Sequence, residues 1–148
     1  MKILLKNRQR RRRLNNKKIL RTAGHILSIT KHETAELSIL FVGDRKMAEL
    51  NSAYRGIDKS TDVLSFEAGI PVKHGSADEV LGDIVINIAR TESQAKEYGT
   101  TFYDELYRLL IHGTLHLLGH DHEASPSRAR TMRKKETEIF NALKKMDR

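Results

Sequence analysis

Four of the seven histidines of this 148-residue chain lie within eleven residues, at positions 112, 116, 120 and 122. His112 and His116 are four residues apart, and on an α-helix this spacing places both imidazoles on one face, about 6 Å apart along the axis. Gly119 follows where a left-handed residue typically ends a helix, so the chain can turn back and bring His122 to the same ion. We therefore predict a metal site formed by His112, His116 and His122.

Three imidazole ligands are typical of a catalytic zinc site, because structural zinc is usually closed by four ligands, mostly cysteine thiolates. The chain contains no cysteine. The open position would hold a water whose pKa zinc lowers toward ~7, which favours a hydrolase. A three-imidazole site also accepts other divalent transition metals such as nickel, cobalt or manganese, so zinc is a preference.

The spacing matches the metalloprotease pattern His-Glu-x-x-His-x-x-Gly-x-x-His except that Gly113 stands in place of the glutamate. In those peptidases the glutamate is the general base, so its absence argues against ordinary peptide hydrolysis. His120 is an alternative third ligand, and Asp121 is a candidate for orienting a ligand imidazole. We expect the isolated histidines at the surface, namely His25, His32 and His74.

Basic residues are concentrated near the two ends of the sequence. The first 21 residues contain ten of the 27 lysines and arginines and no acidic residue. Such clusters bind phosphates of a polyanion in many proteins, although terminal basic segments also occur as solvated tails. The candidate contacts to such a polyanion are Arg10, Arg11, Arg12 and Arg13 in the first cluster and Arg128, Arg130 and Arg133 in the second.

The composition favours a globular protein of the cytoplasm with no membrane partner. Only 39% of the residues are apolar, and no apolar run approaches the ~20 residues needed to cross a membrane. No hydrophobic signal segment leads the printed sequence, and the absence of cysteine is compatible with a reducing compartment. At this length we expect one domain, residues 1–148.

Periodicity and turn residues predict four strands and five helices. We expect strands over 3–6, 35–42, 62–66 and 82–87, and helices over 16–28, 45–54, 89–98, 101–118 and 125–144. The arginine run falls in a loop between the first strand and the first helix, and 71–78 is an exposed loop. Early strands and late helices favour an α+β sandwich, a small mixed four-stranded sheet packed with helices, with the metal site at the end of the central helix 101–118.

Three segments together resemble one known family. The first contains Asn51, Tyr54, Arg55, Gly56, Asp58 and the run Thr61-Asp62-Val63-Leu64-Ser65-Phe66; the second is Leu81-Gly82-Asp83-Ile84; the third is His-Gly-x-Leu-His-Leu-x-Gly-x-Asp-His from His112. In this order they resemble the bacterial YbeY family of metal-dependent endoribonucleases, the ribosomal RNA maturation factors. Two features depart from the family pattern: Glu67 stands where proline is common, and the arginine run is not a family hallmark.

The resemblance implies the family's α+β fold, one Zn²⁺ ion held by His112, His116 and His122, and a single-stranded RNA substrate. It also implies roles in 16S ribosomal RNA 3′-end maturation and in ribosome quality control, with small ribosomal subunit proteins and assembly GTPases as partners. Arg55 matches the arginine that the family places by the metal and needs for activity. A forked guanidinium suits a bidentate phosphate contact, whereas the alternative is an ion pair with Asp58 or Asp62.

The general base is open, with His120, Asp121 and Ser65 as candidates. Two other functions also stay open. A noncatalytic RNA-binding assembly factor with a structural zinc is favoured by the basic ends and the missing glutamate. A zinc peptidase or amidase would need an unusual base but no basic surface.

Overall fold

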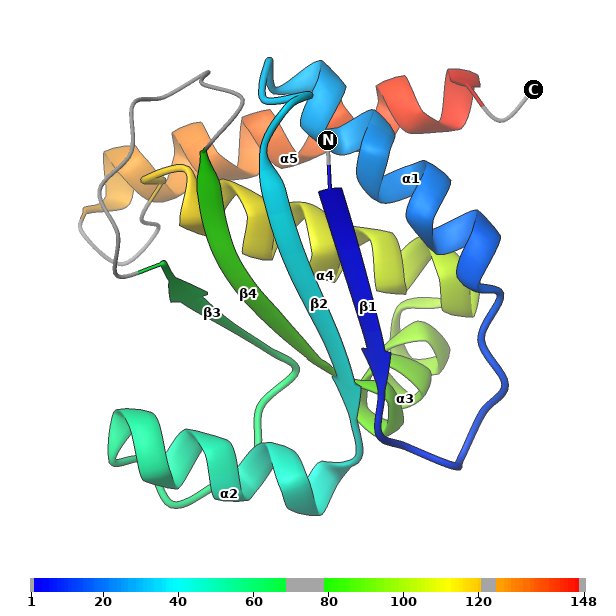
Figure 1. The fold of residues 1–148 in the computed structure, drawn as a ribbon, viewed down its shortest axis with the longest axis vertical. Coiled ribbons are helices and arrows are strands. Elements are labelled where there is room, and N and C mark those ends of the chain that lie inside the picture. Colours follow the sequence, from blue (N-terminus) through cyan, green and yellow to red (C-terminus); the bar gives the residue numbers. More distant parts are fainter. Residues whose placement is uncertain (1, 69–78, 121–124, 147–148) are drawn as a thin grey trace.

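In a computed structural model, which describes residues 2–68, 79–120 and 125–146, four strands form one mixed sheet (Figure 1). These strands are β1 (Lys2–Asn7), β2 (Glu36–Val42), β3 (Val63–Glu67) and β4 (Val80–Asn87), and their order in the sheet is β1-β2-β4-β3. The central strand β2 runs parallel to both β1 and β4, whereas the edge strand β3 is antiparallel to β4. The predicted small mixed sheet is confirmed.

The described residues also form five helices: α1 (Asn16–Ile29), α2 (Asp44–Arg55), α3 (Ile88–Tyr98), α4 (Phe102–Leu117) and α5 (Pro126–Met146). Helix α1 connects β1 to β2 and α2 connects β2 to β3, whereas α3, α4 and α5 follow β4. Each described element begins and ends within two residues of its predicted bounds, so the α+β prediction is confirmed. The predicted loop over 71–78 lies outside the described residues. Within the described ranges, none of the helices combines the length and apolar character needed to cross a bilayer.

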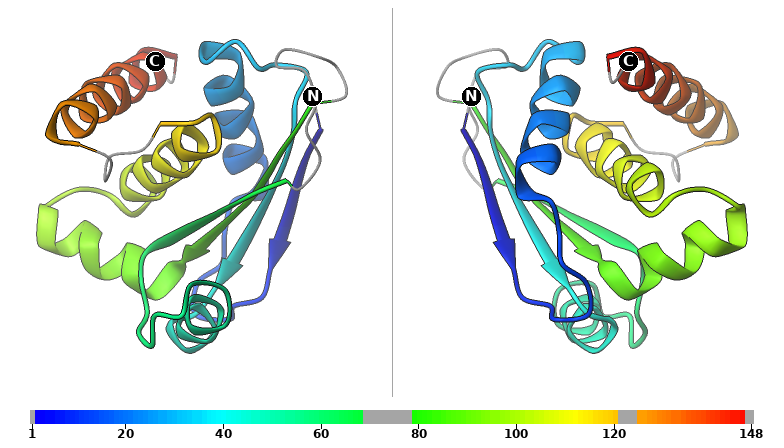
Figure 2. Two further views of the ribbon diagram at one scale, coloured as in Figure 1. Left: turned by 90° about the vertical axis from the view of Figure 1, so that its left-hand side faces the viewer. Right: turned by 90° about the vertical axis from the view of Figure 1, so that its right-hand side faces the viewer.

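The helices are distributed unequally over the two faces of the sheet. Figure 2 shows α1, α3, α4 and α5 on one side, with α5 outermost, and α2 across one end of the sheet. Successive strand residues point to opposite faces, so Ile84 and Ile86 of β4 join the main core while Val85 packs in a smaller cluster with Met47 of α2. The main core therefore holds α4 directly against the sheet.

Helix α4 has clear start and stop signals. The Thr101 side chain accepts a hydrogen bond from Asp104 N (3.1 Å), which satisfies one of the unpaired N–H groups of the first turn. Beyond its end, Gly119 has a φ of +97°, a left-handed conformation that costs glycine little. His120 N then donates to Leu115 O (3.0 Å), so the chain turns back over the helix end, as the sequence predicts.

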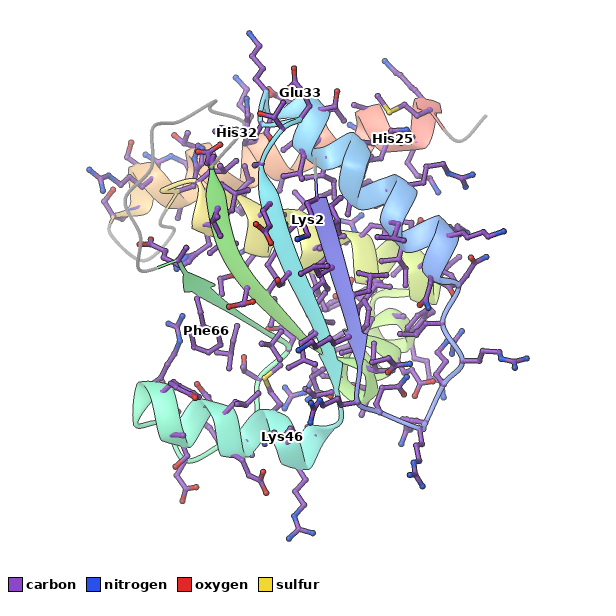
Figure 3. All side chains as sticks on the ribbon, viewed as in Figure 1. Lys2, His25, His32, Glu33, Lys46 and Phe66 are labelled. Carbon is purple, nitrogen blue, oxygen red and sulfur yellow. The ribbon has the colours of Figure 1, made fainter. Side chains whose placement is uncertain are left out.

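The expectation that His32 lies at the surface is wrong. Its Nδ1 lies 2.8 Å from Glu79 Oε1, and the two side chains are only 16% and 2% exposed. The pair joins the segment after α1 to the residue before β4, near one end of the sheet (Figure 3). Burying Glu79 requires a hydrogen-bonding partner, which explains why this histidine is partly covered and does not project into solvent. His25 is half-buried on α1, and His74 lies outside the described residues.

Candidate active site and metal centre

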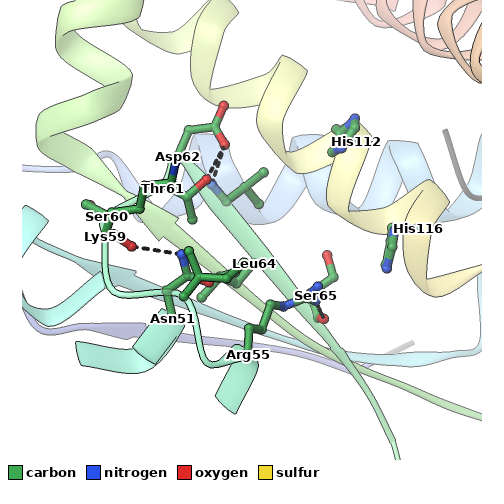
Figure 4. A pocket seen from close by; sticks show the side chains of 12 residues that line it. Asn51, Arg55, Lys59, Ser60, Thr61, Asp62, Leu64, Ser65, His112 and His116 are labelled. Carbon is green, nitrogen blue, oxygen red and sulfur yellow. Dashed lines mark hydrogen bonds between the residues drawn. The ribbon is translucent and has the colours of Figure 1, made fainter. Parts of the chain in front are cut away.

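A cleft of about 460 Å³ runs between α4 and the segment that joins α2 to β3 (Figure 4). The α4 side contributes His112 and His116, which the helical spacing places on one face. The opposite side contributes Arg55 from the end of α2 and Ser65 from β3. Residues far apart in the sequence thus meet in one cavity, and all four are candidate site residues of the sequence analysis.

The connection between α2 and β3 is held in shape by buried polar contacts. The amide of Asn51 is buried, and its Nδ2 donates to Lys59 O (2.8 Å). Asp62 Oδ1 accepts from Val63 N (2.7 Å), while Asp62 O accepts from Asn87 N (2.9 Å). These bonds hold the wall of the cleft that carries Lys59 and Asp62 in one conformation, because each polar group is bonded to a specific protein atom and not to mobile water.

Arg55 is oriented by its backbone neighbours on β3. Its Nη2 donates to Ser65 O (2.9 Å), and its guanidinium lies 5.9 Å from the centroid of the Phe66 ring. In the described part of the chain no ion pair joins Arg55 to Asp58 or Asp62, so the ion-pair alternative is not what the structure shows. Arg55 thus lines the wall of the cleft that lies across from His112 and His116 (Figure 4).

The position of the missing metalloprotease glutamate faces the sheet. A Cβ atom on Gly113 would lie 2.9 Å from Ile84 Cγ2, closer than packed side chains allow, and 3.1 Å from Ser65 Oγ, which is a tight contact. Ser65 Oγ donates to Gly113 O (3.2 Å), so the helix backbone and β3 are in direct contact here. A glutamate at this position would point into the packed face of the sheet. Its absence therefore follows from how closely α4 approaches β3 and β4.

A carboxylate from α5 lies behind one of the histidines. Glu136 Oε2 is 3.4 Å from His112 Nδ1, and this hydrogen bond raises the pKa of His112 against the opposing effect of burial. Since a carboxylate accepts, Nδ1 carries the proton, and Nε2 is then the nitrogen that can ligate a metal. The sequence analysis missed Glu136, because nothing local connects residues 24 positions apart on two different helices.

The proposed third ligand lies outside the described residues, as does Asp121. Among the residues that the structure does describe, no group of three His, Cys, Asp or Glu side chains is close enough to hold a metal ion. His120 is described and half-buried, immediately after the turn at Gly119. Among the described residues, the structure therefore brings together two of the predicted ligands, His112 and His116.

Two arginines of the first basic cluster make structural contacts. Arg11 and Arg12 both pair with Glu92 of α3, and Arg12 also stacks on Phe102 at 3.9 Å. The Arg11 contact, together with that of Arg12, holds the pKa of Glu92 below its ordinary value. Phe102 is the first residue of α4, about 20 Å along the helix axis from His116. This part of the cluster therefore fastens a loop at the far end of α4.

The other basic candidates remain exposed. Arg10 and Arg13 flank the fastened pair, and Arg128, Arg130 and Arg133 lie on the first half of α5. Arg133 is one turn before Glu136, and the two residues line the same small cavity. The C-terminal basic cluster is thus on the helix that contacts the histidine site, whereas the N-terminal cluster lies at the opposite end of α4.

Comparison with known proteins identifies relatives along nearly the whole chain. A family model described as Endoribonuclease YbeY matches residues 4–144. Proteins named Endoribonuclease YbeY are 44% identical in Thermodesulfovibrio yellowstonii, over 93% of this chain and 94% of the relative, and 38% identical in Geobacter sulfurreducens, over 97% and 96%. The solution structure of TM1509 from Thermotoga maritima is similar with a TM-score of 0.61 and 28% identity, covering 93% of this chain and 86% of that one.

Proposed function

The chain belongs to the YbeY family of endoribonucleases, and we propose that it is a metal-dependent enzyme that cuts single-stranded RNA in the cleft between α4 and β3. The observation that carries this proposal is the meeting of His112, His116 and Arg55 in one cavity. Two imidazoles suit a metal ion, and a guanidinium suits a phosphate. Both kinds of group around one reacting phosphorus accelerate phosphodiester hydrolysis, since each stabilises the negative charge that develops on the phosphate.

We infer that His112, His116 and His122 hold one zinc ion. The donor chemistry fits a metal ion, because the two imidazoles share a helix face. In addition, His112 Nδ1 is hydrogen-bonded to the Glu136 carboxylate, which leaves Nε2 for the metal. A bound zinc ion would act as a Lewis acid toward the negative charge that grows on the phosphate. Other divalent transition metals also suit imidazole ligands. Glu136 would keep His112 in the ligating tautomer and hold its ring in position.

Arg55 would bind the phosphate and stabilise its developing charge. One of its five N–H donors is used on Ser65 O, and this bond together with the Phe66 ring orients the remaining donors. A guanidinium held in this way forms bidentate hydrogen bonds to two phosphate oxygens and loses little side-chain entropy on doing so. These bonds strengthen as charge moves onto the phosphate, which is how they would raise the rate.

The proton acceptor of the reaction is best sought at the end of α4. Ser65 already donates its hydroxyl proton to Gly113 O within the packed interface, which makes it the weakest of the three candidates. His120 and Asp121 follow directly on the turn at Gly119, in which His120 N is bonded to Leu115 O beside His116. We therefore place the general base in this segment.

The cellular role that the family implies is maturation of the 3′ end of 16S ribosomal RNA and quality control of ribosomes. Small ribosomal subunit proteins and assembly GTPases would be the partners, and the cytoplasm the compartment. A formal net charge of +8 supports binding to a large RNA substrate, because basic side chains release counterions from the phosphate backbone.

The first experiment compares RNA cleavage by the zinc-loaded protein with that by His116→Ala. His25→Ala is the matched control, since His25 lies on α1 away from the cleft. We expect the protein and the control to cleave a labelled single-stranded RNA and His116→Ala to leave it intact. RNA binding without cleavage by any of the three would favour the assembly-factor function, and peptide cleavage would favour the peptidase.

A second experiment separates phosphate binding from metal binding. Arg55→Ala is expected to reduce cleavage by a factor of about 100 or more while its zinc content stays normal. Arg45→Ala is the control, because Arg45 is an exposed arginine at the other end of the same helix. Analysis of the product ends completes the test: attack by the adjacent 2′-hydroxyl leaves a cyclic phosphate, and attack by water does not.

A further inference from the structure

A hollow of about 250 Å³ lies between α4 and α5, two helices that pack side by side (Figure 2). Two arginines line it, Arg108 from α4 and Arg133 from α5. Glu136, which is bonded to His112, also lines it, so the hollow reaches the back of the histidine site. We refer to it as the α4–α5 hollow. Neither the cleft nor the proposed metal site accounts for its two guanidinium groups.

Arg108 lacks the acidic partner that its place on α4 would supply. Asp104 lies four residues earlier, a spacing at which a carboxylate and a guanidinium commonly pair on one helix. In the structure, however, both carboxylate oxygens of Asp104 lie 3.2 Å from Lys144 Nζ. Among the described residues no carboxylate pairs with Arg108, and its guanidinium stacks on the Phe140 ring at 4.3 Å. Stacking orients the guanidinium and leaves its N–H donors available to another group.

Arg133 lacks its local partner for the same kind of reason. Glu136 lies three residues further along α5, again a spacing for ion pairs, but its carboxylate is bonded to His112 Nδ1 (3.4 Å). The Arg133 side chain is exposed, and within the described ranges no carboxylate pairs with it. Both acidic side chains that helical spacing offers to these arginines are therefore paired elsewhere.

Two unpaired guanidinium groups that line one small hollow attract an anion. Their mutual repulsion costs free energy, which a negative charge between them would offset. A guanidinium forms paired hydrogen bonds to two oxygens of one phosphate, so arginine suits this ligand especially well. The Glu136 carboxylate is the one acidic group among the described lining residues, and it is directed to His112. Two positive groups against one negative group leave the hollow positively charged.

Arg108 continues the row of histidines along α4. Arg108, His112 and His116 follow one another at intervals of four residues, so neighbours in this row lie about 6 Å apart along the axis. This distance is comparable to the reach of one nucleotide along a single strand. A strand whose reacting phosphate lies in the cleft at His112 and His116 would therefore have a neighbouring phosphate close to Arg108.

Resting on the proposed function, we propose that the α4–α5 hollow binds a backbone phosphate of the RNA, one or two linkages from the phosphate that is cut. Arg108 and Arg133 both donate hydrogen bonds to its oxygens. This contact holds the strand on the α5 side of the histidines, while Arg55 holds it across the cleft. Within the C-terminal basic cluster the role falls to Arg133, because Arg128 and Arg130 lie outside the hollow.

The test replaces the linkages of a short labelled single-stranded RNA one at a time by uncharged methylphosphonates. With the zinc-loaded protein, binding is followed by fluorescence anisotropy on ice and cleavage by kcat/KM. Besides the cut linkage itself, we expect one neighbouring linkage to be sensitive, with affinity falling about 3- to 30-fold, the size of one charge-assisted contact at an exposed site. The slope of log Kd against log salt concentration should fall by about 0.7 for that linkage.

Variants of the two arginines show whether the sensitive linkage lies in the hollow. Arg108→Ala and Arg133→Ala should each reduce the penalty in part, and together to less than about twofold, because the charge removed from the RNA is then one that the protein no longer binds. Lys135→Ala is the matched control, since it removes a positive charge from α5 outside the hollow and should leave the penalty unchanged. Arg108→Lys keeps the charge but not the fork, so it should restore the salt slope without the full affinity.

The outcomes separate this proposal from the proposed function. Cleavage with the same linkage penalties in Arg108→Ala, Arg133→Ala and the control would overturn the phosphate site and leave the endoribonuclease intact. Coupled binding without cleavage would support the phosphate site and overturn the activity. Coupling to Arg133 alone would place the phosphate on α5 outside the hollow and would also overturn the proposal.

Discussion

Replacing Gly113 by alanine tests whether α4 is as close to the sheet as the site requires. The added Cβ would lie 2.9 Å from Ile84 Cγ2 and 3.2 Å from its Cδ1. Ile84 is fully buried, so it has little room to move, and overpacking of this kind costs about 1–3 kcal/mol. Alanine also favours a helix over glycine by about 1 kcal/mol. The net loss of unfolding free energy should therefore be about 0–2 kcal/mol.

A double-mutant cycle separates these opposing effects. Ile84→Ala alone should cost about 2–5 kcal/mol, but it removes the two isoleucine atoms that the new Cβ would meet. In that background the tight contact left to the Cβ is Ser65 Oγ at 3.1 Å, so Gly113→Ala should recover much of the helical gain of about 1 kcal/mol. The two substitutions are thus expected to couple by about 1–3 kcal/mol in urea unfolding.

Val85→Ala supplies the matched control for this cycle. Val85 is the next residue of β4 but belongs to the cluster on the opposite face of the sheet, so its coupling to Gly113→Ala should be below about 0.5 kcal/mol. Additive effects of Gly113→Ala and Ile84→Ala would refute the packing argument. Gly113→Glu, which completes the metalloprotease pattern, should yield no peptidase activity because its side chain points into the sheet.

Three further predictions follow from buried or paired charges. Burial raises the pKa of Glu105, so the contribution of this group to stability is fully present below the ordinary glutamate pKa of about 4.3 and is lost as pH rises. Glu105→Gln should therefore gain stability relative to the natural protein in urea unfolding as pH rises above about 4.3, and a constant difference would contradict this. Glu136→Ala should weaken zinc binding about 10- to 100-fold in a chelator competition, whereas the exposed Glu138→Ala on the same helix should not. Arg12→Ala should lower the unfolding free energy by about 1 kcal/mol through loss of its contacts with Glu92 and Phe102, while its exposed neighbour Arg13→Ala changes stability by less than about 0.5 kcal/mol; equal effects would show that the contacts add nothing.

The parts of the site that the sequence predicts are local ones. The periodic leucines before His112, the cap at Thr101 and the turn at Gly119 all act within a few residues, so the helix and its two histidines could be placed from the pattern alone. The strands and their mixed character follow from similar local signals, together with the resemblance to a known family. The meeting of Arg55 with the histidines was available only through that resemblance.

The parts that could not be predicted depend on tertiary contacts. Nothing near Glu136 indicates that it lies behind His112, because the contact arises from how α5 packs on α4. His32 appears as a surface residue until Glu79 is placed beside it, 47 positions away. Arg11 and Arg12 belong to a uniformly basic run in sequence, but only the fold brings Glu92 to them. In each case the partner is a glutamate far away in the sequence, and hydrophobic periodicity does not indicate which charged residues pair.

Strand β1 forms one edge of the sheet, and an open edge of this kind can lead to aggregation when the protein is concentrated. Among the described strands, β1 pairs only with β2, so its outer row of N–H and C=O groups is a template on which a second copy could add a strand. Its middle is apolar, and Leu4 is 42% exposed, but Lys2 and Lys6 flank it. Two copies meeting edge to edge would bring these ammonium groups together, and like charges on facing strands repel. Part of the N-terminal positive charge thus protects against aggregation, independently of any contact with RNA.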